Sequence, residues 1–305
     1  MADGRPIGVF DSGVGGLTVL GEIMRRLPHE STLYLGDNAR APYGTRSDEE
    51  VLAFTRQALD QFVERDVKAV VIACNTSTAV ALADLRRRHR LPIMGVIRPG
   101  AAAATLATRS RRVGVIATPA TVRSHAYFQA IKEENPAVEV YEHATPALVP
   151  MVEAGQLSGP AVEQVVREAL APLLGERDAD GEFVFPLPPS ARIDTLLLGC
   201  THYPLLRSVI QAVAGERVAV VDSATATASA LVDLLAMNGL EAPGTSRGTA
   251  ADAGRAGHDA PVGVVVKAVH RQLTTGDVEA FRRLAERLFG PTFADVEALA
   301  LRVSA

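Results

Sequence analysis

Two cysteines, Cys74 and Cys200, stand at the ends of two apolar runs, and each is followed by small polar residues. The run before Cys74 reads Val-Lys-Ala-Val-Val-Ile-Ala, and the run before Cys200 reads Thr-Leu-Leu-Leu-Gly. Such runs predict buried parallel strands that lead into helices. Open α/β sheets bind ligands at the carboxyl ends of their strands, so both thiols are expected where chemistry takes place.

Two thiols on opposite sides of a small ligand can act as base and acid. A thiolate on one face removes a proton from carbon while a thiol on the other face delivers one, which inverts the carbon centre. A free thiol has a pKa of about 8.5, so one side needs local help. Asp11 and Ser12, which end the first strand, are the expected partners of Cys74, and His202 is the expected partner of Cys200.

Three other interpretations of the cysteines remain open at this point. A cysteine in a buried strand is often only a small apolar side chain. A zinc site of Cys74, Cys200, His202 and Asp11 has suitable ligand types but lacks the local ligand pairs that organise such sites. A cysteine hydrolase would use one cysteine with a histidine base, and it leaves the second cysteine unexplained.

The loop Asp11-Ser12-Gly13-Val14-Gly15-Gly16 follows a strand and precedes a helix, as a nucleotide-binding loop does. Asp37 lies near the distance expected of a ribose-binding acid. The third glycine of that fingerprint is missing, because Thr18 stands in its place. A non-catalytic module that binds a nucleotide or another small ligand therefore remains an alternative.

Apolar periodicity and turn residues predict strands alternating with helices, which indicates parallel sheets covered on both faces. Ser47 and Glu50 have the spacing of a capping box at the start of one helix. The expected strands are 7–10, 32–35, 67–73, 112–117, 195–199, 218–222 and 262–266, and the expected helices are 17–27, 47–65, 77–89, 204–214, 225–238 and 278–289.

The chain also shows an approximate internal repeat. The segment 112–121 matches the opening segment 7–13, with Gly114 in the place of Gly8 and Thr118 in the place of Ser12. The stretch 175–190 has the composition of a surface loop, and 239–259 that of a flexible insertion. We therefore expect two related α/β halves, each of which contributes one thiol.

Composition narrows the class of protein. The 305 residues carry a net charge of −4 with scattered basic residues, so we expect no nucleic-acid partner. No apolar stretch approaches the roughly 20 residues of a membrane span, and the N-terminus lacks the apolar core of a signal peptide. Two widely separated cysteines do not form a disulfide framework, so we expect a cytoplasmic protein that does not act at a membrane.

Four motifs in this order resemble those of the bacterial glutamate racemases, in the aspartate/glutamate racemase family. They are Phe10-Asp11-Ser12-Gly13-Val14-Gly15-Gly16-Leu17-Thr18, Ala41-Pro42-Tyr43-Gly44, Ala73-Cys74-Asn75-Thr76 and Gly199-Cys200-Thr201-His202-Tyr203-Pro204. The late segment Thr274-Thr275-Gly276-Asp277 is similar to the end of that family, so the resemblance covers nearly the whole chain.

The resemblance implies cofactor-independent interconversion of L- and D-glutamate, with D-glutamate supplied for peptidoglycan synthesis. Cys74 and Cys200 would exchange the proton, assisted by Asp11, His202 and Glu153. The implied substrate contacts are Asp11, Ser12, Tyr43, Gly44, Asn75, Thr76, Thr118, Thr121, Thr201 and His202. A racemase of another small acid such as aspartate, or of a hydantoin, is the nearest rival.

The family fold implies two α/β domains related by a pseudo-two-fold axis, with the substrate in the cleft between them. We expect the first domain to comprise residues 1–98 and 208–305 and the second to comprise residues 99–207. A homodimer is expected from the family alone. The chain departs from the family at Ser77-Thr78 and in the two added stretches, which leaves the chemistry unaffected.

Overall fold

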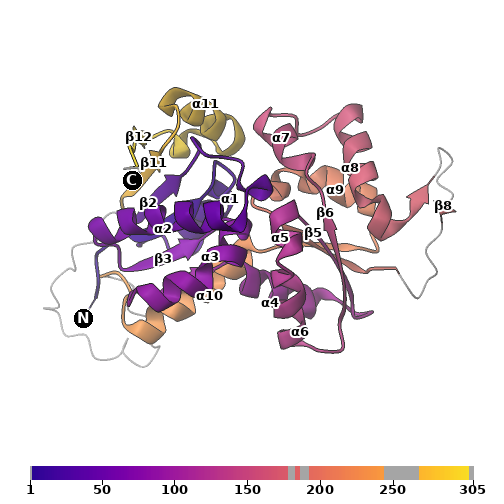
Figure 1. Cartoon of the computed structure of the whole chain (residues 1–305), viewed down its shortest axis with the longest axis horizontal. Helices are drawn as coiled ribbons and strands as arrows, with labels where there is room; N and C mark the ends of the chain where they lie inside the picture. Colours follow the sequence, from indigo (N-terminus) through magenta and orange to yellow (C-terminus); the bar gives the residue numbers. More distant parts are fainter. Residues whose placement is uncertain (1, 178–182, 186–191, 244–267, 302–305) are drawn as a thin grey trace, which may run out of the picture.

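The structure is a computed structural model that describes residues 2–177, 183–185, 192–243 and 268–301. These residues form two α/β units that lie side by side (Figure 1). We call the unit built on the six-stranded sheet the first unit and the unit built on the four-stranded sheet the second unit. The expected class, two parallel-sheet α/β units, is confirmed.

The first unit is a parallel sheet in the order β12-β11-β2-β1-β3-β4. Helices α1, α10 and α11 cover one face and α2 and α3 the other, so the central strands are buried on both sides. The strands are β1 (Ile7–Asp11), β2 (Thr32–Gly36), β3 (Ala69–Ile72), β4 (Ile93–Gly95), β11 (His270–Thr274) and β12 (Val296–Ala298); the helices are α1 (Leu17–Arg26), α2 (Asp48–Glu64), α3 (Asn75–Arg88), α10 (Ala224–Asn238) and α11 (Val278–Phe289).

The second unit is a parallel sheet in the order β10-β9-β5-β6. Leu196 and Leu198 face α7, α8 and α9, whereas Leu197 faces α4 and α6, as the two-residue period of a strand requires. The strands are β5 (Arg112–Ala117), β6 (Glu139–Ala144), β9 (Thr195–Gly199) and β10 (Ala219–Asp222); the helices are α4 (Ile97–Ala107), α5 (Pro119–Arg123), α6 (Ala126–Glu134), α7 (Leu148–Glu153), α8 (Pro160–Leu174) and α9 (Arg207–Ala214).

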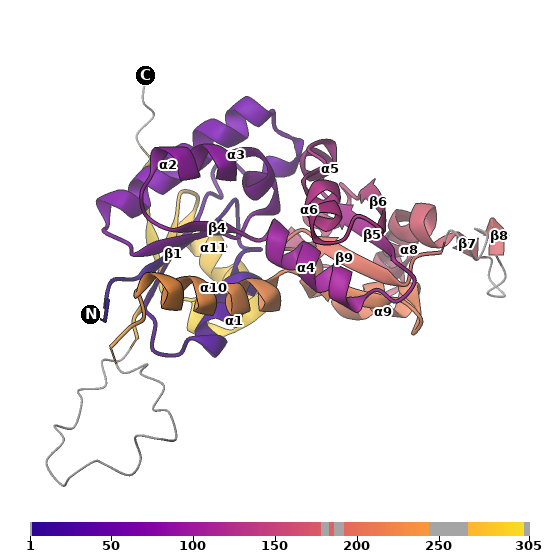
Figure 2. The ribbon, with the colours of Figure 1, turned by 90° about the horizontal axis from the view of Figure 1, so that it is seen from below.

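The two sheets share one strand order, which bears directly on the internal repeat. The order β10-β9-β5-β6 corresponds to β4-β3-β1-β2, so β5 is the counterpart of β1 and β9 that of β3. By the same match β10 is the counterpart of β4. The second sheet therefore extends to Asp222, beyond the expected boundary at residue 207, and the chain re-enters the first unit at α10, which packs against α1 (Figure 2).

The helix ends agree closely with those expected from the sequence. The Ser47–Glu50 capping box begins α2, and α11 has the expected bounds. Helix α3 begins at Asn75, two residues earlier than expected, which makes Cys74 its N-cap. None of the helices in the described ranges is long and apolar enough to cross a membrane.

The two added stretches are only partly described. Two short strands, β7 (Glu176–Arg177) and β8 (Phe183–Phe185), pair antiparallel, so the stretch 175–190 contains paired strands and not only the expected loop. The strand expected at 262–266 and most of the expected insertion at 239–259 lie outside the described residues.

Candidate active site

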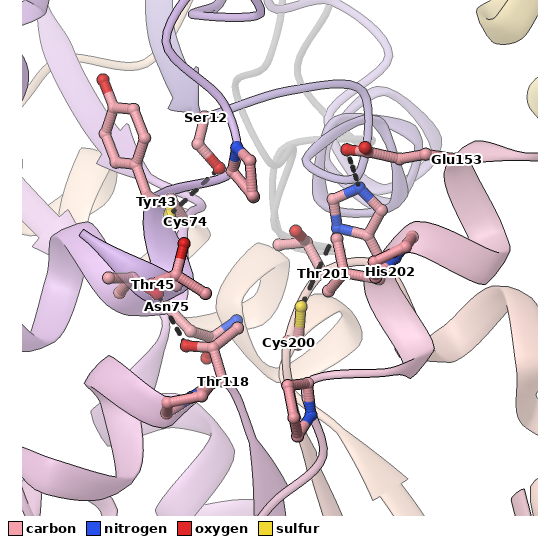
Figure 3. A pocket seen from close by; sticks show the side chains of 17 residues that line it. Ser12, Tyr43, Thr45, Cys74, Asn75, Thr118, Glu153, Cys200, Thr201 and His202 are labelled. Atoms are coloured by element: carbon pink, nitrogen blue, oxygen red, sulfur yellow. Dashed lines mark hydrogen bonds and ion pairs between the residues drawn. The ribbon is translucent and has the colours of Figure 1, made fainter. Parts of the chain in front are cut away.

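A cavity between the two units receives side chains from both of them (Figure 3). Cys74 approaches from the first unit and Cys200 from the second, and the sulfur atoms lie on opposite walls. The lining residues are Ser12, Pro42, Tyr43, Gly44, Thr45, Cys74, Asn75, Thr76, Thr118, Pro119, Pro146, Val149, Pro150, Glu153, Cys200, Thr201 and His202.

Cys74 lies where β3 gives way to α3. Its Sγ accepts a hydrogen bond from the backbone N–H of Ser77 at 3.5 Å and lies 3.6 Å from Ser12 Oγ. Burial, joined by the negative charge of Asp11, raises the pKa of Cys74 to about 11, although the contacts with Ser77 and Ser12 oppose this. Cys74 is therefore a thiol that holds its proton at neutral pH.

Cys200 has different neighbours. Its Sγ lies 3.8 Å from Nδ1 of His202, and Nε2 of the same ring lies 3.2 Å from Oε1 of Glu153, the last residue of α7. Burial of His202 lowers its pKa, but the contacts with Cys200 and Glu153 and the charge of Asp11 outweigh burial and raise the pKa to about 10. The imidazole is therefore held protonated, and it places a positive charge beside the Cys200 sulfur.

Asp11 is fully buried and does not line the cavity. Its carboxylate accepts hydrogen bonds from the N–H of Gly13 at 3.0 Å and from Oγ1 of Thr201 at 3.2 Å. Burial raises the pKa of Asp11, and the charge of His202 opposes the rise. Since β1 belongs to the first unit and Thr201 to the second, Asp11 helps to join the units behind the cavity.

Three threonine hydroxyls form a second bridge between the units. Thr76 Oγ1, in α3, lies 2.9 Å from Thr118 Oγ1 and 3.3 Å from Thr121 Oγ1, and the latter two are 3.1 Å apart. Thr118 is the N-cap of α5, and its Oγ1 accepts from the N–H of Thr121. Thr76 and Thr118 line the cavity, whereas Thr121 stands behind them.

Asp37 serves a structural purpose that excludes ribose binding. It is buried, and its carboxylate accepts hydrogen bonds from the Tyr43 hydroxyl, from Nε of Arg40 at 2.7 Å and from Oγ1 of Thr275 at 2.6 Å. These contacts fix Tyr43 in the cavity wall. Asp37 is therefore not available to bind a ribose, and the nucleotide-binding interpretation has no acidic residue to support it.

Two glycines, one in the first loop and one in the Tyr43–Thr45 turn, have a packing explanation. A Cβ on Gly15 would lie 2.5 Å from His202 Nδ1, and one on Gly44 would lie 2.6 Å from Cβ of Thr118. Both distances are shorter than any ordinary contact. Gly15 and Gly44 therefore let the two units approach closely around the cavity.

The structure brings most of the expected site residues into one cavity. Cys74, Cys200, His202, Glu153, Ser12, Tyr43, Gly44, Asn75, Thr76, Thr118 and Thr201 line it, while Asp11 and Thr121 lie one hydrogen bond behind the wall. Direct substrate contacts by Asp11 and Thr121 therefore do not follow from this geometry. Five further lining residues could not be predicted from the sequence, because their types and spacing indicate no particular chemistry: Thr45, Pro119, Pro146, Val149 and Pro150.

Metal binding finds no support in the described part of the chain. No group of three or more His, Cys, Asp or Glu side chains there is placed to hold a metal ion. The zinc interpretation is therefore dropped on geometry. The hydrolase interpretation has its Cys200–His202 pair, but it gives no purpose to Cys74 in the same cavity.

Comparison with known proteins places this chain in a family. The family described as Asp/Glu/Hydantoin racemase matches residues 13–181. The glutamate racemase of Lactococcus lactis is 40% identical over 288 residues, which are 93% of this chain and 92% of that protein. A solved glutamate racemase isoform from Bacillus anthracis has a TM-score of 0.82 at 38% identity and covers 98% of both chains. The glutamate racemase of Francisella tularensis, solved with D-glutamate, has a TM-score of 0.79 at 33% identity, again with 98% of both chains covered.

The chain therefore belongs to the Asp/Glu/Hydantoin racemase family. It is an isomerase of the amino-acid racemase class, and its similarity within the family is to the glutamate racemases.

Proposed function

We propose that this protein interconverts L- and D-glutamate by moving a proton between the two faces of Cα, without a cofactor. The observation that carries the proposal is the pair of thiols on opposite walls of one cavity. The relatives at 40% to 44% identity over nearly the whole chain bear the name glutamate racemase, which supports glutamate as the substrate.

The unequal surroundings of the thiols define the resting state of this mechanism. Cys200 is the proposed base, because its sulfur lies beside the His202 imidazolium, which Glu153 supports from the other side of the ring. Cys74 rests as a thiol, because burial and Asp11 oppose its ionisation. One base and one acid are therefore present before the substrate arrives.

The proton transfer balances with these two groups alone. The Cys200 thiolate takes the proton from Cα, and the Cys74 thiol gives its proton to the opposite face of the same carbon. Cys200 ends as a thiol and Cys74 as a thiolate. A Cys74 thiolate with a Cys200 thiol is the state that the opposite enantiomer needs, so the same two groups catalyse the reverse reaction. Proton exchange of both sulfur atoms with solvent restores the first state.

Neutral hydrogen-bond donors are expected to bind the substrate carboxylates. Ser12, Asn75, Thr76, Thr118 and Thr201 offer hydroxyl or amide groups at the cavity wall. Backbone N–H groups in the first turn of α3, where Asn75 and Thr76 line the cavity, add to them. Among the described residues, the lining contains no arginine or lysine, which suits a substrate that must be held in two mirror-related poses.

Incubation with L-glutamate in deuterated water tests the activity. We expect D-glutamate that carries deuterium at Cα, formed without any added cofactor. L-Aspartate in a parallel sample tests the nearest rival substrate. A folded sample with reduced thiols that exchanges neither enantiomer of glutamate would exclude the proposed function.

Separate replacement of the cysteines tests their individual roles. Cys74→Ser and Cys200→Ser should each reduce racemisation at least a hundredfold, since loss of a positioned acid or base typically costs 10² to 10⁴. Each variant should still release halide from one enantiomer of a β-halogenated glutamate, because elimination needs only one base. The two variants should prefer opposite enantiomers. Normal racemisation by either variant would contradict the two-thiol mechanism.

We further propose that the product enters peptidoglycan synthesis, and that the protein is a cytoplasmic homodimer, as the bacterial family implies. Depletion of the protein in its host, with D-glutamate added back to rescue growth, tests the first statement. Sedimentation of the purified protein tests the second, and cell fractionation tests the location.

A further inference from the structure

Tyr127 is a fully buried side chain near the start of α6, in the second unit. Its hydroxyl donates a hydrogen bond of 2.6 Å to Oδ1 of Asn75, the first residue of α3 in the first unit. This bond crosses between the units, and neither partner belongs to the thiol chemistry described above.

The ring of Tyr127 reaches the other thiol segment. A Cβ on Gly199 would lie 2.9 Å from Cε2 of Tyr127, so the ring packs directly on the backbone of Gly199. Gly199 precedes Cys200, and Asn75 follows Cys74. One side chain therefore contacts the neighbours of both thiols.

The hydrogen bond also fixes the orientation of the Asn75 amide. An asparagine has one acceptor and one donor group, and here the Tyr127 hydroxyl occupies the acceptor. Nδ2 is buried, and it has no hydrogen-bond partner within the described ranges. Asn75 lines the cavity between Cys74 and Thr118 (Figure 3). A buried unpaired donor is costly unless a ligand pairs with it.

We propose that Tyr127 is a positioning residue for substrate binding. Its hydroxyl holds the Asn75 amide so that Nδ2 donates to a carboxylate of the amino-acid substrate, and its ring supports Gly199 beneath Cys200. This inference rests on the proposed function, because it takes a diacid as the occupant of the cavity.

Tyr127→Phe tests the proposal, because it keeps the ring and removes only the hydroxyl. The Asn75 oxygen then loses its partner, the amide is free to turn, and the donor is no longer held toward the substrate. We expect KM to rise on the order of tenfold for both enantiomers of glutamate, as for the loss of one hydrogen bond to a charged group. We expect kcat to change less than KM, since the thiols remain in place.

A control and a double substitution separate positioning from general stability. Thr55→Val removes another buried hydroxyl bond, within α2 and away from the cavity, and should leave KM unchanged. In an Asn75→Ala background, Tyr127→Phe should raise KM no further. An unchanged KM in Tyr127→Phe would overturn the inference, and so would effects of the two substitutions that multiply.

Binding of D-glutamate to the Asn75→Asp variant, measured by calorimetry, tests the role of the amide donor directly. The new carboxylate would still accept the Tyr127 bond but would present an oxygen to the substrate in place of the amide donor. D-Glutamate binding should therefore weaken more than tenfold; unchanged binding would overturn the inference. If the wild-type protein binds D-glutamate but does not racemise it, the proposed function fails while the binding series still decides the role of Tyr127. A wild-type protein that does neither would overturn both.

Discussion

Cys74 and Cys200 are the same residue type, yet the protein surrounds them with different charges. Burial favours the neutral thiol of Cys74, the nearby Asp11 carboxylate adds to this effect, and the pKa of Cys74 rises to about 11. The neighbour of the Cys200 sulfur is instead the positively charged imidazolium of His202. The assignment of base and acid therefore depends on His202, and through it on Glu153.

Glu153→Gln tests this dependence through pH. Glu153 helps to raise the pKa of His202 to about 10, so its neutral substitute should lower that pKa. The protonated imidazole is the form that supports the Cys200 thiolate. Activity is therefore present below the pKa of His202 and declines as the pH rises through it. We expect the alkaline limb of kcat/KM to move to lower pH in the variant.

The measurement is kcat/KM for each enantiomer over about pH 6 to 11, the range in which these groups titrate. Glu163→Gln is the matched control, because Glu163 is an exposed residue of α8 that pairs with Arg167 and does not line the cavity. Its pH profile should match that of the wild type. An unmoved alkaline limb in Glu153→Gln would mean that Glu153 does not act through His202.

At this scale the sequence predicted the residues with distinctive chemistry. Cys74, Cys200 and His202 could be found because strand ends are where α/β sheets place reactive groups. Glu153 could be predicted as a site residue only from the family resemblance, because no sequence pattern around it indicates that α7 places it beside His202. Asp11 was expected to contact the substrate, but its burial depends on how closely Thr201 approaches, which is a tertiary property.

Short elements at the rim determine how closely the units approach. The Tyr43–Thr45 turn of the first unit meets the start of α5 in the second, with Gly44 against Thr118. The same Thr118 belongs to the threonine bridge with Thr76 and Thr121. Any side chain on Gly44 must therefore push against the residue that joins the units.

Gly44→Ala should reduce both activity and stability. The added methyl would lie 2.6 Å from Cβ of Thr118 and would displace the turn or α5. Overpacking of this kind costs about 1–3 kcal/mol, and displaced substrate donors should reduce kcat/KM roughly tenfold or more. Steady-state kinetics with denaturant unfolding gives both values.

Gly21→Ala is the matched control for this substitution. Gly21 lies within α1, and an added Cβ would meet only Phe293 at an ordinary 3.7 Å. Alanine is the better helix former by up to about 1 kcal/mol, so stability should hold or rise while kcat/KM stays unchanged. A Gly44 variant that behaves like the Gly21 variant would contradict the steric argument.

A buried ion pair joins four segments of the chain at the end of the first sheet away from the cavity. Lys68 Nζ lies 2.5 Å from Glu30 Oε2 and donates to the backbone oxygen of Asp3, and Glu30 Oε1 accepts from the N–H of Ala242. Both side chains are almost wholly buried. The pair therefore joins the N-terminal segment, the connection between α1 and β2, the start of β3 and the residues after α10.

Lys68→Met should destabilise the protein by about 3–5 kcal/mol, because it leaves the Glu30 carboxylate buried and unpaired. Chemical denaturation measures this free energy of unfolding. Arg271→Met is the comparison, since it breaks an ion pair with Glu297 in which both partners are half exposed, and it should cost less than about 1 kcal/mol. An equal decrease in the free energy of unfolding in the two variants would show that the buried pair contributes no more to stability than the exposed one.

Sequence patterns predicted many of the strands and helices but not the boundary between the two units. Apolar periodicity predicted most elements of the first unit and the strands β5, β9 and β10, but it did not predict β4, β6 or the helices α4 to α8. The internal repeat could be found from Gly8 and Gly114. The domain boundary could not, because the sequence of β10 does not reveal which sheet it joins. Its place beside β9 follows from the repeated strand order, in which β10 corresponds to β4.

Across the whole molecule, the cavity has one wall from each unit, and the chain passes between the units before α4 and again before α10. Donors for a substrate are therefore divided: Ser12, Asn75 and Thr76 belong to the first unit, and Thr118 and Thr201 to the second. A ligand that contacts both sets should stabilise the units as one body.

This division of donors predicts a ligand-dependent stability. Free ligand at about 100 times Kd adds roughly 2.7 kcal/mol to the folded state, which corresponds to a rise of several degrees in Tm for a chain of this size. D-Glutamate should produce this rise. D-Aspartate, shorter by one methylene, should produce less, because its carboxylates cannot reach donors on both units equally well. Calorimetric scans of the Cys74→Ser, Cys200→Ser double variant, which cannot change the ligand, give the comparison. Equal shifts would instead favour a racemase that does not distinguish the two acids, and no shift with either would contradict a substrate held between the units.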